Sequence, residues 1–516
     1  MYYQSLCEDE DKVYIVKAET MRNFKILSAC MCLFICLIFV NAYSQEELGD
    51  GTIKAWIENA FEYDVRIHEP DIVINVHEGI VTLTGTVKNL AEEKFALQET
   101  QKISGVIGII NELQIIPVKR SDSEIASDVE RRFKSNPLLK DKVIQVSVSE
   151  GGVQLAGIVH SISELKEAQV LASEVMGVVS VINGLQINYP AERTDKEIAE
   201  DVRSSLQRDV YLTGMPVEVS VNNGLVTLSG KVSSLYLKVR AGNDVNWIWN
   251  VQGLQNNIDV DWWEEQDVRR SPVAPTTDEI KENIENELYQ DLRLKDPFNI
   301  NVDVSFGEVT LTGTVESYRQ KQLAVNDVLN VVGVIGVTNM LNVRQESRPD
   351  EVIQKDVQTN LNTDNALAGQ DVMASVSDGA VTLTGNVETT YQKLHAENIA
   401  YQVEGVQGVI NELDVNWILD YADSTLQKRI KDRLRQDSET SWVADMISVE
   451  VRNKVATLTG EVNFWSERME AARVAYTTEG ITRVENRITI HDVNFPEQQW
   501  YNPNTDYLEH FVLPEL

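Results

Sequence analysis

The sequence predicts an α+β fold: a tandem array of small αββαβ domains, each with a three-stranded mixed sheet and two helices on one face. The main observation behind this prediction is a V-T-L-T-G phrase, or a close variant, that occurs six times. Its last residue is Gly85, Gly157, Gly230, Gly313, Gly385 and Gly460, so the intervals are 72, 73, 83, 72 and 75 residues. Apolar and polar residues alternate around each glycine, as in half-buried strands. An amphipathic helical pattern lies on either side of these strands.

The repeat also predicts the domain boundaries. We expect domains 1 to 6 at residues 49–118, 119–189, 190–262, 276–346, 347–417 and 418–491. Residues 263–275 form a linker that lengthens one interval to 83 residues, and we interpret it as a hinge between two sets of three domains. Residues 492–516 form an acidic C-terminal tail.

The first helix of a domain is predicted from its N-terminal capping signals. Three domains have the Ser/Thr-x-x-Glu spacing of a capping box: Ser121 and Glu124, Thr194 and Glu197, and Thr276 and Glu279. In this motif the hydroxyl oxygen accepts a hydrogen bond from a backbone N–H of the first turn, and the glutamate accepts one from the capping residue. A helix is therefore expected before the first strand of each domain.

A hairpin of two strands is expected next. Its turn residues include Glu78-Gly79, Asn223-Gly224 and Asp378-Gly379, and pairs such as Asn-Gly and Asp-Gly accept the positive φ angles of tight hairpin turns. The repeated glycine lies within the second strand, which predicts a bulge or a close approach by the following helix. Ala96 and its counterparts are the expected small partners on that helix.

The second helix and the third strand complete the domain. In domain 1 the helix is expected at residues 90–103, with Gly105 as its left-handed C-terminal cap. Asn250 takes the place of this glycine in domain 3. An asparagine lies 26 residues after each repeated glycine, at Asn111, Asn183, Asn256, Asn339, Asn411 and Asn486. We expect these asparagines to hydrogen-bond to local backbone. Because domains of this size are marginal alone, we expect neighbours to support one another.

Residues 1–44 are predicted to be a secretory signal peptide. The apolar run at 26–40 is about 15 residues long, shorter than the roughly 20 residues that a membrane span needs. Ala42 and Ser44 fit the small residues of a cleavage site, so the mature chain would begin at Gln45.

The N-terminus leaves three further points open. Met21 is the expected true start, because residues 1–20 are acidic whereas a signal peptide begins with basic residues. An uncleaved membrane anchor is one alternative to cleavage. Lipidation at Cys30 is another, although few apolar residues precede this cysteine.

Composition excludes several classes of function. The chain has 46 Lys and Arg against 80 Asp and Glu, a net charge of -34. Such a chain is a poor nucleic-acid binder, because phosphates require a dense basic surface. All four cysteines lie in the first 36 residues, which excludes disulfides and thiolate chemistry from the six domains.

Motifs for catalysis or metal binding are not found in the sequence. The six histidines lie at non-equivalent positions of the repeat and lack the spacing of metal ligands: His68, His77, His160, His395, His491 and His510. There is no nucleophile elbow, phosphate-binding glycine loop or dinucleotide fingerprint. We therefore predict no catalytic residues, no metal site and no cofactor.

The order of elements, the V-x-L-x-G strand, the following Gly-Val and the asparagine before the last strand resemble the BON domain of bacterial envelope proteins. The resemblance covers residues 49–491, in six copies rather than the usual one or two. It implies a periplasmic or otherwise exported protein, with a role in osmotic or envelope stress and attachment to phospholipid surfaces. It implies no catalytic residues.

Two groups of basic residues are candidates for contact with a phospholipid or envelope surface. They lie on the predicted first helices of domains 2 and 6: Arg131, Arg132, Lys134, and Lys428, Arg429, Lys431, Arg433, Arg435. The leading hypothesis is a non-enzymatic envelope protein that is associated with the membrane through such a surface. Several domains that each bind weakly would together give stable attachment. A structural spacer or protein-binding scaffold without lipid affinity is the alternative, and cation binding by acidic domains is a third.

Overall fold

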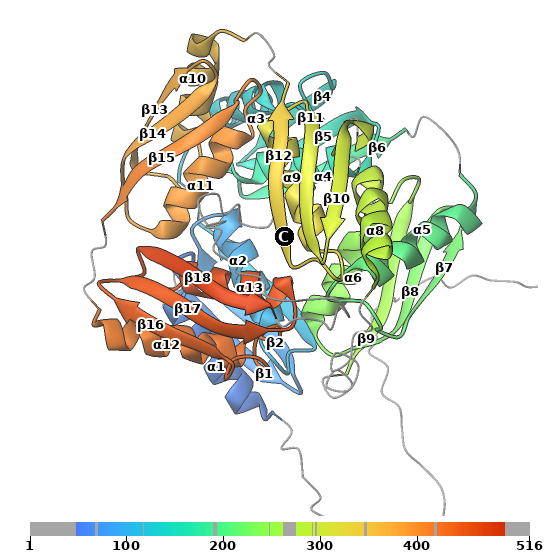
Figure 1. Ribbon diagram of the computed structural model, residues 1–516. Helices are drawn as coiled ribbons and strands as arrows, with labels where there is room; N and C mark the ends of the chain where they lie inside the picture. The colour runs from blue at the N-terminus through green and yellow to red at the C-terminus, as the bar shows by residue number, and fades with distance from the viewer. Residues whose placement is uncertain are drawn as a thin grey trace, which may run out of the picture. The chain divides into compact units, whose positions relative to one another are not determined.

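Each repeat folds as helix–strand–strand–helix–strand in the computed structural model (Figure 1), which confirms the predicted fold class. The structure describes residues 48–67, 71–116, 118–188, 193–246, 248–261, 275–291, 293–294, 297–344, 348–416 and 421–490. The predicted signal peptide, the acidic tail and the predicted hinge, apart from its last residue, lie outside these ranges.

The first three domains have the following elements. Domain 1 contains α1 (Asp50–Tyr63), β1 (Ile72–His77), β2 (Ile80–Val87), α2 (Leu90–Lys102) and β3 (Gly108–Ile115). Domain 2 contains α3 (Asp122–Ser135), β4 (Ile144–Ser149), β5 (Gly152–Val159), α4 (Ile162–Ser173) and β6 (Ser180–Ile187). Domain 3 contains α5 (Asp195–Arg208), β7 (Val217–Asn222), β8 (Leu225–Val232), α6 (Leu235–Asn246) and β9 (Gly253–Val260).

The last three domains repeat the same order. Domain 4 contains α8 (Thr277–Gln290), a short 3-10 helix η2 (Pro297–Asn299), β10 (Ile300–Ser305), β11 (Glu308–Val315), α9 (Tyr318–Leu329) and β12 (Gly336–Val343). Domain 5 contains α10 (Asp350–Asn362), β13 (Asp371–Ser377), β14 (Ala380–Val387), α11 (Thr390–Tyr401) and β15 (Gly408–Val415). Domain 6 contains α12 (Asp423–Gln436), β16 (Ile447–Arg452), β17 (Val455–Val462), α13 (Trp465–Tyr476) and β18 (Arg483–Ile490).

Every sheet has the second strand of its domain in the middle, as β2 lies between β1 and β3. The hairpin pair is antiparallel and the pair formed with the third strand is parallel. Along β2, Val81, Leu83 and Val87 are buried, and the residues between them are partly exposed. One face of each sheet therefore packs against the two helices of its domain and the other face is turned to solvent.

The predicted local signals are present in the structure. All three predicted capping boxes form, with Ser121, Thr194 and Thr276 as the capping residues. The hairpin turn of domain 1 has positive φ at both Glu78 (50°) and Gly79 (75°), as do the Asn223-Gly224 and Asp378-Gly379 turns.

The structure also shows a hairpin contact that was not expected. In five domains, an aspartate in the first turn of the first helix accepts hydrogen bonds from both backbone N–H groups of the hairpin turn. In domain 1, the Asp50 carboxylate accepts from Glu78 N at 2.9 Å and from Gly79 N at 3.0 Å. The counterparts of Asp50 are Asp122, Asp195, Asp350 and Asp423.

The close approach expected at the repeated glycine comes from the adjacent strand and not from the helix. Gly85 has a φ of 109°, and a Cβ at this position would overlap the carbonyl oxygen of Asp71, immediately before β1. The same overlap with the backbone at the beginning of the first strand occurs at Gly157, Gly230, Gly313, Gly385 and Gly460. A side chain is thus excluded by the hairpin partner and by the left-handed backbone.

The repeated asparagine joins the third strand to the second helix through a side-chain hydrogen bond. In domain 5, Asn411 donates through Nδ2 to the carbonyl oxygen of Lys393 in α11 at 2.8 Å, and its Oδ1 accepts from Leu413 N. Asn183, Asn256, Asn339 and Asn486 make the same pair of bonds, whereas Asn111 donates to the Glu93 carboxylate instead. The local bond was expected, and the bond across 18 residues of sequence was not.

Candidate functional site at the domain junctions

Domains from the two halves of the chain are joined in pairs by isolated antiparallel β-bridges. Domain 1 pairs with domain 6 through Asp64 and Thr478 and through Ile103 and Asp437. Domain 2 pairs with domain 5 through Val175 and Asp364, and domain 3 pairs with domain 4 through Asp209 and Val331. The pairing is therefore nested: 1 with 6, 2 with 5, and 3 with 4.

These bridges use two equivalent positions of the repeat. One partner lies one or two residues after the end of the first helix and is an aspartate in all four bridges: Asp64, Asp209, Asp364 and Asp437. The other partner lies 18 residues after the repeated glycine, as Ile103 does after Gly85. This arrangement changes the expectation for Gly105: α2 ends at Lys102, the extended Ile103 forms the bridge, and Gly105 turns the chain afterwards with a φ of 87°.

Domains of the same half touch through the first residue of the second helix. Leu90 of α2 packs against the core of domain 2, and Leu235 of α6 packs against the core of domain 1. Tyr318 of α9 belongs to the core of domain 5 and stacks on Tyr401 with ring centroids 4.3 Å apart. Thr390 of α11 donates through Oγ1 to Ile481 O of domain 6 at 2.5 Å.

The junction of domains 1 and 6, which we call junction 1·6, contains a buried and balanced charge network. Four acids and four bases form its buried ion pairs: Asp64, Glu99, Asp437, Glu470, and Arg66, Lys102, Arg433, Arg473. At the edge of the same junction, Arg429 pairs with the exposed Glu62 at 3.4 Å. Arg433 reaches across to Asp64 at 2.8 Å and to Glu99 at 3.1 Å. Burial alone would raise the pKa of Glu99, but Arg473, Arg66 and Arg433 outweigh it and hold this pKa well below its usual value.

Junction 2·5 is smaller and centres on Asp364. This carboxylate accepts from Arg132 of domain 2 at 3.0 Å and contacts Nε2 of His395 at 2.9 Å. Burial opposes ionisation of Asp364, but His395 and Arg132 outweigh it and lower its pKa to about 2. Burial likewise disfavours charge on His395, yet Asp364 raises the pKa of its imidazole overall.

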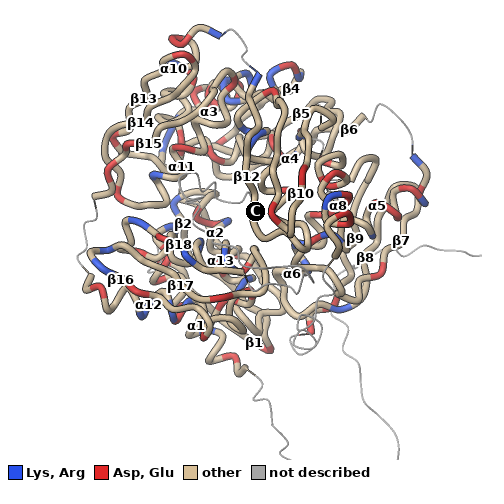
Figure 2. Tube along the Cα trace, in the orientation of Figure 1, with Lys and Arg blue, Asp and Glu red and all other residues tan. Residues whose placement is uncertain are grey.

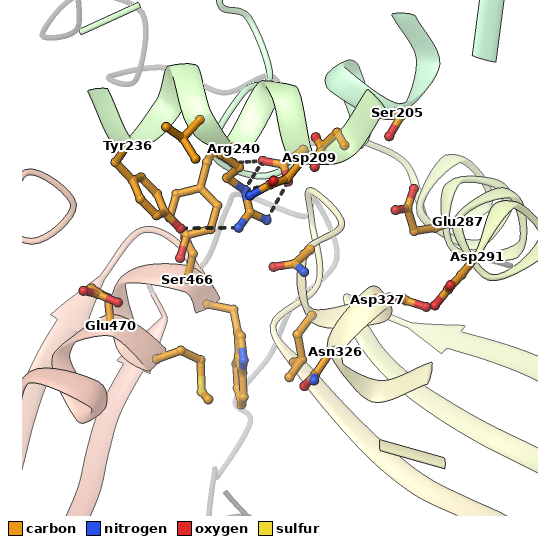
Figure 3. Close-up of a pocket in the computed structure, with 18 of the residues that line it drawn as sticks. Ser205, Asp209, Tyr236, Arg240, Glu287, Asp291, Asn326, Asp327, Ser466 and Glu470 are labelled. Carbon is orange, nitrogen blue, oxygen red and sulfur yellow. Dashed lines mark hydrogen bonds and ion pairs between the residues drawn. The ribbon is translucent and has the colours of Figure 1, made fainter. Parts of the chain in front are cut away.

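Junction 3·4 has a surplus of acid. Five carboxyl groups meet three guanidinium groups: Asp209, Asp244, Glu287, Asp291, Asp327, and Arg208, Arg240, Arg293. Figure 3 shows Asp291 and Asp327 with their carboxyl groups facing each other. Burial and then Asp291 raise the pKa of Asp327 well above its usual value, and burial and then Asp209 do the same for Asp244.

Two cavities lie where these junctions meet. One of about 390 Å³ is lined by residues of domains 1, 3, 4 and 6, mainly from α2, α6, α9 and α13. Another of about 180 Å³ is lined by residues of domains 1, 2, 4, 5 and 6, including the aromatic rings of Phe95, Tyr391 and Tyr401. Gln98, Asn326 and Arg473 line both cavities. The second helices of all six domains therefore contribute to this pair of cavities.

The basic residues predicted to contact an anionic surface lie in two different environments. Arg132, Arg429 and Arg433 are buried, and each pairs with a carboxylate of another domain: Asp364, Glu62 and Asp64, respectively. Lys134, Lys428 and Arg435 are exposed, and Arg131 and Lys431 are partly exposed. The buried guanidinium groups are used to join domains, so only the other five residues are accessible to a surface.

The residues that form the junctions were not predicted from the sequence. A signal was present for one class of them, since an aspartate precedes the repeated glycine by 21 to 23 residues in domains 1, 3, 4, 5 and 6. Its partners on the second helix vary between domains. Arg240, His395 and Glu470 occupy the same repeat position, ten residues after the glycine, so no repeated motif marks them.

The described residues do not contain a group of three or more His, Cys, Asp or Glu side chains placed to hold a metal ion. None of the helices within the described ranges is long and apolar enough to cross a membrane.

A three-stranded mixed sheet with two helices on one face, repeated six times and joined through helix ends, defines a tandem-domain protein. The sequence profile of the BON domain matches residues 49–117, 121–189, 194–261, 276–345, 349–416 and 422–492. The chain therefore belongs to the BON domain family, as its sequence motifs indicated.

Two curated proteins are similar to parts of the chain. Osmotically-inducible protein Y of Escherichia coli (strain K12) is 33% identical over 146 residues, which cover 27% of this chain and 73% of that protein. An uncharacterized protein in the gshII 5'region of Anaplasma centrale is 29% identical over 128 residues, which cover 23% of this chain and 82% of that protein.

Two of the solved structures that are similar to this chain are parts of type III secretion systems. The C-terminal domain of CdsD from Chlamydia trachomatis is 14% identical with a TM-score of 0.12, and the match covers 44% of this chain and all (100%) of that one. The periplasmic domain of PrgH from S. typhimurium is 13% identical with a TM-score of 0.12, and the match covers 37% and 99%, respectively.

Proposed function

We propose that this chain is an exported, non-enzymatic envelope protein that supports tolerance of osmotic or envelope stress and binds a phospholipid or envelope surface. Similarity to osmotically-inducible protein Y is the observation that carries the stress role. The family membership of all six domains supports an envelope location.

The surface contact is proposed for the outer side of α12 in domain 6. Lys428, Lys431 and Arg435 lie at three- and four-residue spacing and share one side of this helix. Each cation close to an anionic membrane contributes on the order of 1 kcal/mol. Two of the three already have acidic neighbours, since Lys428 pairs with Asp432 and Arg435 pairs with Asp445. Binding through this face should therefore be weak and sensitive to salt.

Co-sedimentation of the full chain with vesicles tests this contact. We expect the native chain to bind vesicles of anionic phospholipid at low salt and to bind neutral vesicles less. Lys428→Glu/Lys431→Glu/Arg435→Glu should abolish the binding. The matched control reverses three exposed arginines on the sheet of the same domain, Arg452, Arg483 and Arg487, and should retain it. Equal loss in both variants would show that only net charge matters.

A scaffold or spacer without lipid affinity is the alternative function. The net charge of -34 supports it, because anionic lipids repel an acidic surface. Figure 2 shows acidic and basic residues mixed along the described domains. Failure of the native chain to bind either type of vesicle at low salt would favour this alternative.

A further inference from the structure

The cavity of about 390 Å³ has walls of different chemistry. Its 3·4 side presents the carboxyl groups of Asp209, Asp244, Glu287, Asp291 and Asp327, together with Arg240 and Arg293. The opposite side comes from α2 and α13 and includes Trp465, Ser466 and Met469. Lys102 and Arg473 also line it, and both are paired with Glu470. Figure 3 shows Asp209 and Asp327 on one side of this space and Ser466 and Glu470 on the other.

The guanidinium groups on the acidic side are already engaged. Arg240 binds Asp209 with its Nη2 2.6 Å from Oδ2, and Arg208 binds Glu287 at 3.0 Å. Arg293 is shared between Asp291 at 2.9 Å and Asp327 at 3.1 Å. Among the described residues, no donor reaches Oδ2 of Asp244 or Oδ2 of Asp327, although both atoms are buried. The acidic side therefore has two buried carboxyl oxygens that no cationic side chain of the described residues reaches, and the carboxyl group of Asp327 faces that of Asp291 (Figure 3).

A second and independent unpaired group lines the same cavity. The Trp465 side chain is only 7% exposed, and its indole Nε1–H has no hydrogen-bond acceptor among the described residues. A buried donor without a partner is destabilising, so an acceptor from a bound molecule would remove this cost. The acidic side requires a donor and the tryptophan requires an acceptor.

We propose that this cavity binds a small organic cation that has an ammonium group and an oxygen acceptor, such as an amino alcohol. The ammonium group would lie between Asp244 and Asp327, and the oxygen would accept from the indole N–H of Trp465. A bare metal ion does not fit this arrangement, because the described carboxylates do not form a group of three around one point. The site needs domains 3, 4 and 6 together, so it exists only in the assembled repeat.

Titration calorimetry on the full chain at low salt tests this site with ethanolamine as the probe. Ethane-1,2-diol is the neutral comparison, because it keeps the oxygen acceptor and lacks the charge. We expect one ethanolamine per chain and no heat from the diol. Asp244→Asn and Asp327→Asn should each weaken binding about tenfold, and Trp465→Phe should weaken it by a similar factor, the equivalent of one hydrogen bond to a charged or buried group.

The matched control is Asp303→Asn, which removes one carboxylate from the exposed face of β10 and should leave ethanolamine binding unchanged. Thermal melting of each variant establishes that it is folded. Equal weakening by Asp303→Asn, or many weak sites per chain, would mean that ethanolamine is only a counterion of an acidic protein. No binding by the native chain, or an unchanged affinity in Trp465→Phe, would overturn the proposed site.

Discussion

Junctions 1·6 and 3·4 join equivalent domain surfaces but differ in their balance of acidic and basic side chains. In junction 1·6, four bases match four acids. The pKa of Glu99 is held well below its usual value, whereas burial and then Glu470 raise the pKa of Asp437. In junction 3·4, five acids meet three bases, and the pKa values of Asp244 and Asp327 are raised, first by burial and then by neighbouring carboxylates. Equivalent backbone bridges therefore enclose a network of ion pairs in junction 1·6 and a cluster of carboxyl groups with raised pKa values in junction 3·4.

This difference in charge balance shows how equivalent positions of a repeated fold acquire different electrostatic environments. The bridge aspartates Asp64 and Asp209 occupy the same repeat position. The surrounding side chains decide whether that carboxylate is balanced, because a buried charge must be paired to avoid a large desolvation cost. Junction 1·6 meets this condition for most of its acids with bases from both domains. Junction 3·4 has fewer bases than acids, and the raised pKa values of Asp244 and Asp327 favour their protonated forms.

The largest effect is expected from loss of a base at junction 1·6. Arg433→Met should destabilise the full chain by about 3–5 kcal/mol, because it leaves Asp64 and Glu99 buried without this guanidinium. Urea unfolding measures the change. Arg435→Met is the matched control on the same helix: its side chain is 60% exposed and pairs at the surface with Asp445, so its cost should be at most about 1 kcal/mol. Equal costs would show that the buried network does not stabilise the junction.

Neutralising an acid should have opposite effects at the two junctions. Glu470 accepts from Lys102 at 2.9 Å and from Arg473 at 2.6 Å. Burial opposes its ionisation, but Arg473 and Lys102 outweigh burial and lower its pKa. Glu470→Gln should therefore cost about 1.5–3 kcal/mol at neutral pH, measured by urea unfolding.

The pH dependence checks the origin of this effect. Because the folded-state pKa of Glu470 is below the unfolded value, its stabilisation is present above the unfolded pKa and is lost as the pH falls below that value. Glu450→Gln on the exposed face of the sheet is the control. A loss of stability in Glu470→Gln that persisted unchanged in strong acid would contradict the electrostatic explanation.

A smaller effect of opposite sign is expected at junction 3·4. Asp327→Asn mimics the protonated carboxyl group and should raise the free energy of unfolding by on the order of 1 kcal/mol at pH 8. The gain is small because the variant also weakens the contact with Arg293. Since the pKa of Asp327 is raised in the folded state, the native chain should lose stability as the pH rises from the unfolded pKa toward the folded one.

This variant should therefore gain most at high pH and almost nothing near pH 4. Unfolding at several pH values measures the difference, with Asp303→Asn as the exposed control. A destabilised Asp327→Asn chain at pH 8 would mean that the carboxylate is ionised and needed at this junction.

Much of the fold of a single domain was predictable because its signals are local. The capping box at Ser121 and Glu124 and the turn at Asn223-Gly224 depend on backbone angles and bonds within a few residues. The repeated glycine was recognised, but its steric partner was not. The overlap at Gly85 arises with Asp71 across the hairpin, and this contact depends on strand register.

The candidate site was hardly predictable, because its residues come from distant parts of the chain. Lys102 and Glu470 are separated by 368 positions and Arg132 and Asp364 by 232. From the sequence alone, the basic residues of α12 are predicted to form one charged surface. Their helical spacing does not show that Arg429 and Arg433 face domain 1.

The sequence by itself determined the six domains, the order of their elements and the family, because periodicity, caps and turns act over short distances. Only the tertiary structure decided which domains pair, which charges are buried and where the cavities lie. The physical reason is that an ion pair at a domain junction depends on the side chains that two separate helices bring together. The bridge aspartate lies at the same repeat position whether its partner is Arg433 in junction 1·6 or Arg240 in junction 3·4, so its position in the sequence does not show which base it will meet.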